Sequence, residues 1–410
     1  MTETYLVTME KLVYGGDCLG RLPDGRAVFV PFVLPGEQVQ VTLTEDKPRY
    51  ARGLPVDWVT TSPDRISPRC AHFTICGGCQ YQHFDYAKQL TVKETILRDQ
   101  FERIGKVENP PIQPIVPALS PWHYRNTVQF QVGQKGELGY IHTDGEHLLP
   151  IEECHLPQEG ITALWPQIEL GEESGVFRLG IRQDTQDDLM LIMEGEDPKP
   201  PEFGVDIPIS AIYTPPDARL TVLAGEDHLI FSLLGRSFQV SARSFFQVNT
   251  AMAEKMVEHL LQNLDFTGEP AAVELYAGVG LFSAFLAPRV GELVAVESAG
   301  SSCHDFAINL DAFENVSLYE AEAEEVLPVL DIQADLLVMD PPRAGLAPAV
   351  HDAIGRLAPR QIAYISCDPA TLARDTRKIL DKGYQLRSVT PFDLFPQTGH
   401  VESISILTKR

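Results

Sequence analysis

The 410 residues are 44% hydrophobic and 22% charged, which describes a soluble globular chain with enough apolar material for two or three hydrophobic cores. No stretch approaches about eighteen uninterrupted apolar residues, and the first residues lack the pattern of a signal peptide, so we expect neither a membrane span nor secretion. Seven cysteines are too few for a disulfide scaffold. This indicates a reducing, cytoplasmic compartment.

The formal net charge of −24 should repel nucleic acid at long range, so a polyanionic partner would need a local basic patch. Residues 47–103 contain nine Lys or Arg against six Asp or Glu, a local excess of three positive charges. This segment is either such a patch or an ordinary mixed surface.

Residues 1–60 alternate short apolar runs with turn signals such as Pro23-Asp24-Gly25, where Pro presets φ and Gly accepts a positive φ. The pattern predicts a small antiparallel, OB-like barrel. The stretch from Lys47 to Arg52 (KPRYAR) has the basic and aromatic composition with which such barrels bind nucleic acid.

Residues 61–245 are predicted to form a second, β-rich domain. Apolar residues near helical spacing predict a helix over residues 85–104, which is available to pack on the domain that follows, and four prolines in residues 110–117 predict a linker. Strands are predicted at residues 127–132, 176–182, 189–193 and 229–234.

Residues 246–410 change to alternating helix and strand signals. Helices are predicted over residues 250–264 and from residue 281, and strands at residues 271–276, 293–297, 335–340 and 361–366. These strands are nearly all apolar, as in a parallel sheet covered on both faces. The predicted fold class is therefore a multidomain α/β plus β protein, with a barrel, a central β-rich domain and a C-terminal Rossmann-like, doubly wound domain.

The first predicted strand of that domain leads into Ala277-Gly278-Val279-Gly280, and the next strand closes on Glu297. A Gly-rich turn lets the backbone approach a ligand, and a carboxylate at the next strand end suits ribose hydroxyls. Ser283 stands where a dinucleotide fingerprint has its third glycine, which favours S-adenosylmethionine over nicotinamide dinucleotides. Another nucleotide, or a packed turn without ligand, are the alternatives.

Two further motifs follow predicted strands. Asp340-Pro341-Pro342 stiffens the loop at the carboxyl edge of the sheet and is of the type that serves methyl transfer to planar nitrogenous groups, unless it merely ends the strand. Cys367 precedes a predicted helix, whose dipole would favour the thiolate and make it a nucleophile. The alternative is a small buried hydrophobe.

Four cysteines can converge on one site. Cys70, Cys76 and Cys79 lie within ten residues on a Gly-Gly turn, and Cys154 can complete four soft ligands for zinc or an iron–sulfur cluster. The spacing departs from the paired hairpins of zinc ribbons, which favours the cluster. Cys18 and Cys303 lack partners and are expected to be structural.

Taken together, these motifs resemble the RNA uracil-5-methyltransferase family, in particular its iron–sulfur branch acting on 23S ribosomal RNA. The first domain resembles a TRAM domain, the cysteines a 4Fe-4S site and the last third an S-adenosylmethionine-dependent methyltransferase domain. The resemblance implies cofactor contacts in the segment SFFQVN around Gln247, the segment ELYAGVG around Tyr276, and at Glu297, Glu322 and Asp340.

Three positions qualify these cofactor contacts. Ala277 and Leu281 replace the Cys and Asn common in the family. Glu322 is alternatively a solvated residue of an acidic run.

The resemblance also implies the reaction. Cys367 adds to carbon 6 of a uridine, carbon 5 takes the methyl group, and Glu402 removes the carbon 5 proton. The expected partner is 23S ribosomal RNA, with no DNA and no membrane, and the chain is expected to be a monomer. Methylation of a transfer RNA uridine, and a non-catalytic RNA-binding assembly factor, are the alternatives.

Overall fold

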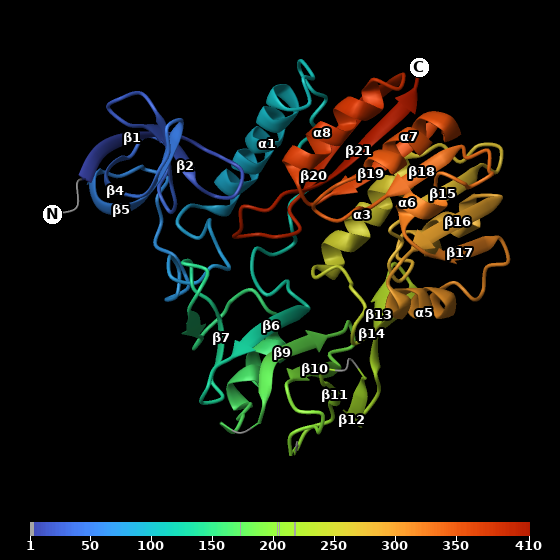
Figure 1. The fold of residues 1–410 in the computed structure, drawn as a ribbon, viewed down its shortest axis with the longest axis horizontal. Helices are drawn as coiled ribbons and strands as arrows, with labels where there is room; N and C mark the ends of the chain where they lie inside the picture. The colour runs from blue at the N-terminus through green and yellow to red at the C-terminus, as the bar shows by residue number, and fades with distance from the viewer. Residues whose placement is uncertain (1–3, 173, 203, 205, 217–218) are drawn as a thin grey trace.

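The computed structural model describes all residues except 1–3, 173, 203, 205 and 217–218. Figure 1 shows three units: a small barrel, a central sheet, and a large sheet flanked by helices that ends near the C-terminus. Among the described helices, none combines the length and the apolar composition needed to cross a membrane.

The N-terminal unit is a closed barrel with strand order β1-β2-β3-β5-β4. Its strands are β1 (Thr4–Leu12), β2 (Cys18–Arg21), β3 (Ala27–Val30), β4 (Gln38–Asp46) and β5 (Tyr50–Thr60). The predicted barrel is confirmed, with one difference: β3 and β5 pair in parallel. Alternate side chains of these strands, such as Val28, Val39 and Val41, fill its interior, as the period of two requires.

Helix α1 (Tyr86–Arg103) joins the barrel to the large sheet. Asp85 caps it by accepting a hydrogen bond from the Lys88 N–H at 3.0 Å. Its residue Val92 packs against the barrel core, whereas Leu97 and Phe101 are buried in a core beneath the large sheet. The helix predicted in the second domain therefore packs on the third.

The central unit is a seven-stranded sheet with order β12-β11-β10-β9-β6-β7-β8. Its strands are β6 (Thr127–Val132), β7 (Leu138–Ile141), β8 (Leu148–Pro150), β9 (Val176–Gln183), β10 (Leu189–Gly195), β11 (Ser210–Thr214) and β12 (Thr221–Ala224), with α2 (Glu159–Leu164) and η1 (Trp165–Gln167) against it. Three of the four predicted strands lie in this sheet.

The fourth predicted strand lies elsewhere. Strands β13 (His228–Leu233) and β14 (Arg236–Ser241) form a separate hairpin. Its side chains Phe231 and Phe238 share a core with Met252 and Met256 of α3 (Thr250–Asn263). The hairpin therefore packs with the helices that follow it in the chain.

The C-terminal unit is a seven-stranded sheet with order β17-β16-β15-β18-β19-β21-β20. Its strands are β15 (Ala271–Leu275), β16 (Glu292–Glu297), β17 (Val316–Glu320), β18 (Leu336–Met339), β19 (Gln361–Ser366), β20 (Tyr384–Phe392) and β21 (Glu402–Lys409). The helices after α3 are α4 (Ser283–Leu286), η2 (Ala287–Arg289), α5 (Gly300–Asn309), α6 (Ala323–Val326), α7 (Pro348–Leu357) and α8 (Pro369–Leu380).

Two hydrophobic cores lie on this sheet, one with α3, α4 and α5, the other with α1, α6, α7 and α8. This arrangement confirms the doubly wound prediction. Strands β15 to β19 pair in parallel, and β21 and β20 pair antiparallel. The predicted strands do not include β17, β20 and β21. Strand β17 is half exposed and β21 alternates Ser with Ile, so neither has the continuous apolar run on which the prediction relied.

The segment between β20 and β21 is held by a buried ion pair. The Lys93 ammonium of α1 donates to the Asp393 carboxylate at 2.5 Å and to the Phe395 carbonyl at 2.9 Å, and both charged side chains are fully buried. A buried charge is stable only while its partner is present. The pair therefore fastens α1 to the chain that leads into β21.

Replacement of Lys93 by Met should leave the Asp393 carboxylate buried and unpaired, and should lower the free energy of unfolding by about 3–5 kcal/mol. Urea unfolding measures this. The matched control is Lys88→Met, on the same helix as Lys93, which removes an exposed ion pair with Asp64. This substitution should lower the free energy of unfolding by less than about 1 kcal/mol. Equal losses for the two variants would contradict the prediction.

Candidate active site

Three predicted site residues meet at one edge of the large sheet. Asp340 follows β18, Cys367 follows β19, and Glu402 begins β21. Strands β18 and β19 run in parallel, so both end at this edge, whereas β21 is antiparallel and starts there, with Ser366 opposite Ser403. We call Asp340, Cys367 and Glu402 the strand-end cluster.

The two carboxyl groups of the cluster are hard to ionise. Glu402 is 4% exposed, and burial, followed by the nearby Asp340 charge, raises its pKa well above the ordinary value. Burial also raises the pKa of Asp340 to about 7. The raised pKa makes Glu402 a stronger base, once ionised, than an ordinary carboxylate.

The Cys367 thiol is partly exposed, but burial and then the Glu402 charge raise its pKa to about 11, against a smaller lowering by Arg343. The raised pKa of Cys367 is opposite in direction to the favoured thiolate expected from the sequence. The Asp368 carboxylate caps α8 by accepting from the Thr371 N–H at 2.8 Å, so the carboxylate occupies the positive end of the helix. The resting thiol is protonated at neutral pH.

Two side chains beside the cluster were not identified from the sequence. Arg343 donates from Nη2 to His400 Nδ1 at 3.1 Å and lies close enough to the Cys367 thiol to lower its pKa. Burial, followed by Arg343, lowers the pKa of His400 to about 4, so its ring is neutral and can accept this bond. The only sequence signal was the place of Arg343 in the Asp-Pro-Pro-Arg stretch after β18.

The Gly-rich loop after β15 is held in a strained backbone form. Tyr276, Gly278 and Gly280 have φ of 60°, 56° and 88°. The Glu297 carboxylate accepts from the Gly278 N–H at 2.8 Å, and its second oxygen accepts from the backbone N–H groups of the next two residues. Glu297 thus shapes the loop, in addition to any contact with a ligand ribose.

Glu274 belongs to the segment expected to contact the cofactor, but its side chain lies below the Gly-rich loop. It is 2% exposed and accepts a hydrogen bond from the Ser283 hydroxyl of α4. Burial raises its pKa to about 8. Glu274 therefore supports the Gly-rich loop through its buried hydrogen bond to Ser283.

The loop that carries Gln247 is fastened from below. The Arg182 guanidinium of β9 donates to the Ser244 carbonyl at 2.9 Å, and the Ser244 hydroxyl donates to the Asp305 carboxylate of α5. Next to these anchors Phe245 is 66% exposed, whereas Gln247 is 9% exposed. The loop therefore presents an aromatic ring to solvent from a rigid base.

Glu322 is exposed directly before α6, at the end of β17. After burial, the charges of Glu324 and Glu322 raise the pKa of Tyr276. Glu322 therefore lies near Tyr276, although β16 separates β17 from β15 in the sheet. The expected cofactor residues Tyr276, Glu297, Glu322 and Asp340 follow or end neighbouring strands at the same edge as the strand-end cluster.

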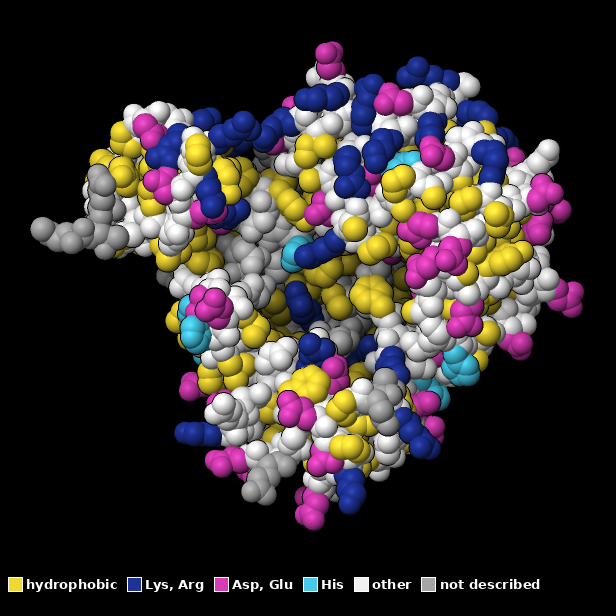
Figure 2. Space-filling view, in the orientation of Figure 1, with side chains coloured by type: hydrophobic (Ala, Val, Ile, Leu, Met, Phe, Trp, Pro, Cys, Tyr) yellow, Lys and Arg dark blue, Asp and Glu magenta, His cyan; other side chains and the backbone are white. Residues whose placement is uncertain are grey.

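Figure 2 shows a hollow on the face where the barrel, the central sheet and the C-terminal sheet meet, with Lys and Arg side chains within and around it. Because the chain as a whole carries a net charge of −24, this local group of Lys and Arg side chains indicates a site for a negatively charged partner. A local basic surface is what an acidic protein needs to hold a polyanion.

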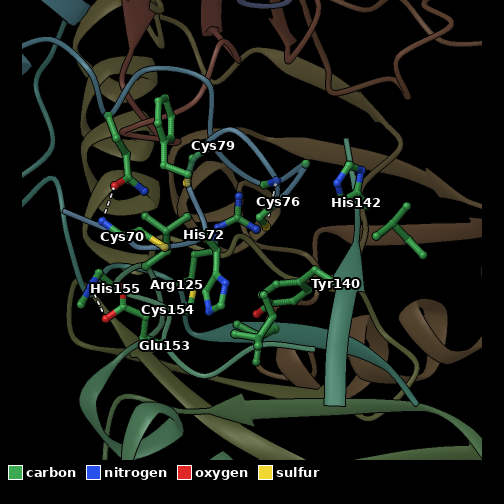
Figure 3. Close-up of a pocket in the computed structure, with 18 of the residues that line it drawn as sticks. Cys70, His72, Cys76, Cys79, Arg125, Tyr140, His142, Glu153, Cys154 and His155 are labelled. Atoms are coloured by element: carbon green, nitrogen blue, oxygen red, sulfur yellow. Dashed lines mark hydrogen bonds and ion pairs between the residues drawn. The ribbon is translucent and has the colours of Figure 1, made fainter. Parts of the chain in front are cut away.

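The four predicted metal ligands line one cavity of about 500 Å³ between the Cys-bearing segment and the central sheet. Figure 3 shows Cys70, Cys76, Cys79 and Cys154 around this cavity, together with Arg125. Burial raises the pKa of all four thiols, that of Cys79 to about 12. The structure thus brings together thiols that are 75 residues apart between Cys79 and Cys154.

The four thiols of this cavity are not arranged around a common metal position in the described structure. Within the described part of the chain, no group of three or more His, Cys, Asp or Glu side chains is placed to hold a metal ion. Neutral thiols have no mutual attraction that would draw their sulfur atoms to one centre. The donor set is nevertheless four soft sulfur ligands, which fits zinc or an iron–sulfur cluster.

Comparison with known proteins agrees with this geometry. Residues 231–410 match the family described as tRNA (Uracil-5-)-methyltransferase, and residues 2–56 match the TRAM domain. An uncharacterized RNA methyltransferase of Thermosynechococcus vestitus is 35% identical over 99% of this chain and 98% of its own length. The 23S rRNA (uracil(1939)-C(5))-methyltransferase RlmD of Enterobacter sp. is 32% identical over 93% of this chain and 91% of its own length.

A solved structure shows the same fold. The tRNA (uracil-54, C5)-methyltransferase of Pyrococcus abyssi, in complex with S-adenosyl-L-homocysteine, has a TM-score of 0.76 at 23% identity and covers 98% of this chain and 99% of that chain. Together with the relatives of more than 30% identity, this leads to one conclusion. The chain belongs to the RNA (uracil-5-)-methyltransferase family and is a methyltransferase.

Proposed function

We propose that the protein transfers a methyl group from S-adenosylmethionine to carbon 5 of a specific uridine in 23S ribosomal RNA, with Cys367 as the nucleophile and Glu402 as the base. The observation that carries the proposal is the strand-end cluster. The antiparallel register of β19 and β21 places Glu402 beside Cys367, and Asp340 lies close enough to raise the pKa of both.

The proposed reaction needs one nucleophile and one base, and Cys367 and Glu402 supply them. Thiolate addition to carbon 6 forms a carbon–sulfur bond and leaves an enolate, whose carbon 5 attacks the sulfonium methyl group and releases S-adenosylhomocysteine. A carboxylate then takes the carbon 5 proton, the bond between sulfur and carbon 6 breaks, and the double bond returns. Because the resting Cys367 thiol has a pKa of about 11, its proton must leave to a neighbouring carboxylate or to solvent as the first bond forms.

The donor site is proposed at the adjoining strand ends. Tyr276, Glu297, Glu322 and Asp340 lie at one edge of the sheet, and Gln247 sits on the loop fastened to α5. Ligands of open α/β sheets bind at this carboxyl edge. S-adenosyl-L-homocysteine in the Pyrococcus abyssi relative supports the same class of donor for this chain.

The choice of ribosomal RNA rests on the Enterobacter relative, which is named for 23S rRNA and is 32% identical across almost the whole chain. Transfer RNA is the second candidate, because the matched family and the solved neighbour are both named for it. In either substrate the target base must leave its stack, since the thiol and the methyl donor need access to the ring.

A methyl-transfer assay with labelled S-adenosylmethionine, 23S ribosomal RNA and transfer RNA tests the substrate. We expect incorporation into 23S RNA at one or a few uridines, mapped by mass spectrometry of nuclease fragments. Incorporation into transfer RNA alone would replace the ribosomal substrate by the second candidate. No incorporation into either RNA would favour a non-catalytic RNA-binding role.

Two substitutions test the proposed mechanism. Cys367→Ala should abolish both methyl transfer and the covalent complex with RNA, because no sulfur remains to add to carbon 6. Glu402→Gln should let a methylated covalent adduct accumulate, because the carbon 5 proton stays in place. Denaturing gels with labelled RNA detect both outcomes. Glu314→Gln, on the exposed surface, is the control and should behave as wild type.

We also propose that the four-cysteine pocket holds a 4Fe-4S cluster. A cavity of about 500 Å³ lined by four thiols is large for a single ion, whose sulfur ligands lie about 2.3 Å from the metal, and better suits a group of several atoms. Its contribution would be structural, because methyl transfer from a sulfonium needs no electron. Cys70, Cys76, Cys79 and Cys154 would be the ligands.

Protein purified without oxygen should be brown and should contain iron and acid-labile sulfide in equal amounts. Cys79→Ala should lower the iron content, because it removes one of the four sulfur ligands. Elemental analysis and the visible absorption spectrum measure this. Cys303→Ala, a buried cysteine outside the pocket, is the control and should retain the iron. Stoichiometric zinc without iron would contradict the cluster.

A further inference from the structure

The turn between β1 and β2 of the barrel, residues 13–17, lies against chain segments next to the strand-end cluster. The turn is closed by a hydrogen bond from the Val13 N–H to the Asp17 carbonyl at 2.9 Å. Its Gly16 has a φ of 101°, and a Cβ there would meet the Gln80 side chain at 2.7 Å. This turn, which we call the barrel turn, is therefore a tightly fitted contact.

The chief contact of the barrel turn is a hydrogen bond across 354 residues of sequence. The Tyr14 hydroxyl donates to the Asp368 carboxylate at 2.9 Å. The other oxygen of this carboxylate accepts from the Thr371 N–H at the start of α8. Asp368 directly follows Cys367, so a barrel residue helps to hold the orientation of the chain at the proposed nucleophile.

The electrostatics of Tyr14 place its hydroxyl close to the catalytic groups. Burial, followed by the Asp368 charge, raises its pKa, and the charges of Arg343 and Cys367 also act on it. The hydroxyl therefore keeps its proton over any working pH range. It can act only as a hydrogen-bond donor to Asp368, which suits a positioning group.

A second contact joins the barrel turn to the chain that leads to Glu402. A Cβ on Gly399 would lie 3.0 Å from the Gly16 nitrogen, so the two backbones pack directly against each other. The Gly399 N–H donates to the Gln80 side chain at 3.1 Å, and the Gln397 carbonyl accepts from the Gln80 N–H at 3.0 Å. The turn thus touches the chain beside both Cys367 and Glu402.

We infer that Tyr14 is a positioning residue of the methyl-transfer site, and that the barrel turn forms one wall of this site. The barrel then does more than offer a surface for RNA, because its docking is needed to orient the Cys367 loop through Asp368. The inference rests on the proposed role of Cys367 as nucleophile. It assigns a function to a residue far from the methyltransferase domain in sequence.

The main test is Tyr14→Phe, which removes only the hydroxyl. We expect kcat for methyl transfer to fall about tenfold with KM for RNA unchanged, the size of effect expected for loss of a hydrogen bond to a charged group. Tyr213→Phe is the control, because it removes a tyrosine hydroxyl of the central sheet that donates to the Asp197 carbonyl, away from the strand-end cluster. It should leave kcat unchanged. Equal kcat in the two variants would overturn the inference.

A double-mutant cycle shows whether Tyr14 acts through Asp368. Asn at position 368 can still cap α8 with its amide oxygen. If the two side chains act together, Tyr14→Phe should cost little more in the Asp368→Asn background, so the effects will not add. If the two substitutions lower kcat independently, so that their effects add in full, Tyr14 does not act through Asp368 and the inferred positioning role is wrong.

Alkylation of Cys367 gives a readout that needs neither RNA nor methyl donor. The charged and titratable groups that act on its thiol are Glu402, Arg343 and Asp340, with Tyr14 close by. Since burial is the largest cause of the raised pKa, Tyr14→Ala should move the pH profile of iodoacetamide labelling from about 11 down towards the ordinary 9.0. Peptide mass spectrometry follows the labelling of Cys367. An unchanged pH profile in the Tyr14→Ala variant would show that Tyr14 does not shield the thiol from solvent.

Failure of this inference can be separated from failure of the proposed function. Cys367→Ala is assayed in parallel: activity that survives in this variant rejects the nucleophile itself, whatever Tyr14 does. If Cys367→Ala is inactive while Tyr14→Phe matches Tyr213→Phe, the proposed reaction stands and only the role of Tyr14 is lost.

Discussion

The antiparallel pairing of β21 with β19 is the constraint on which the site depends. In a sheet whose other strands run in parallel, only a strand of opposite direction can begin where its neighbours end. It therefore brings Glu402 to the edge where Asp340 and Cys367 emerge. Backbone pairing places three groups that interact through charge close together, and their partial or full burial raises the pKa of each.

The N-terminal half of the chain supports this edge from outside the C-terminal sheet. Helix α1 supplies the buried Lys93 that pairs with Asp393, and the Cys-bearing segment holds Gln397 and Gly399. The β9 residue Arg182 fixes the loop beside Gln247. Segments from outside the C-terminal sheet thus hold the chain on both sides of the proposed site.

Charge is distributed in a way that reconciles an acidic protein with an RNA substrate. The net charge of −24 is spread over the chain, whereas Lys and Arg side chains gather around the hollow between the units. Binding of this kind depends on local field and on shape, since long-range attraction is absent. The four-thiol cavity lies where the Cys-bearing segment meets the central sheet.

Local patterns in the sequence were enough for the barrel, helix α1, the parallel strands β15, β16, β18 and β19, and the Gly-rich loop, because apolar periodicity and turn residues act over a few positions. They also indicated Cys367, and the family resemblance added Glu402. The sequence did not reveal that burial raises the pKa of the Cys367 thiol, or that Glu297 shapes the loop. The contacts of Arg343 with His400 and of Tyr14 with Asp368 came only from the tertiary structure. They join positions 57 and 354 residues apart, and such contacts leave no periodic signal along the chain.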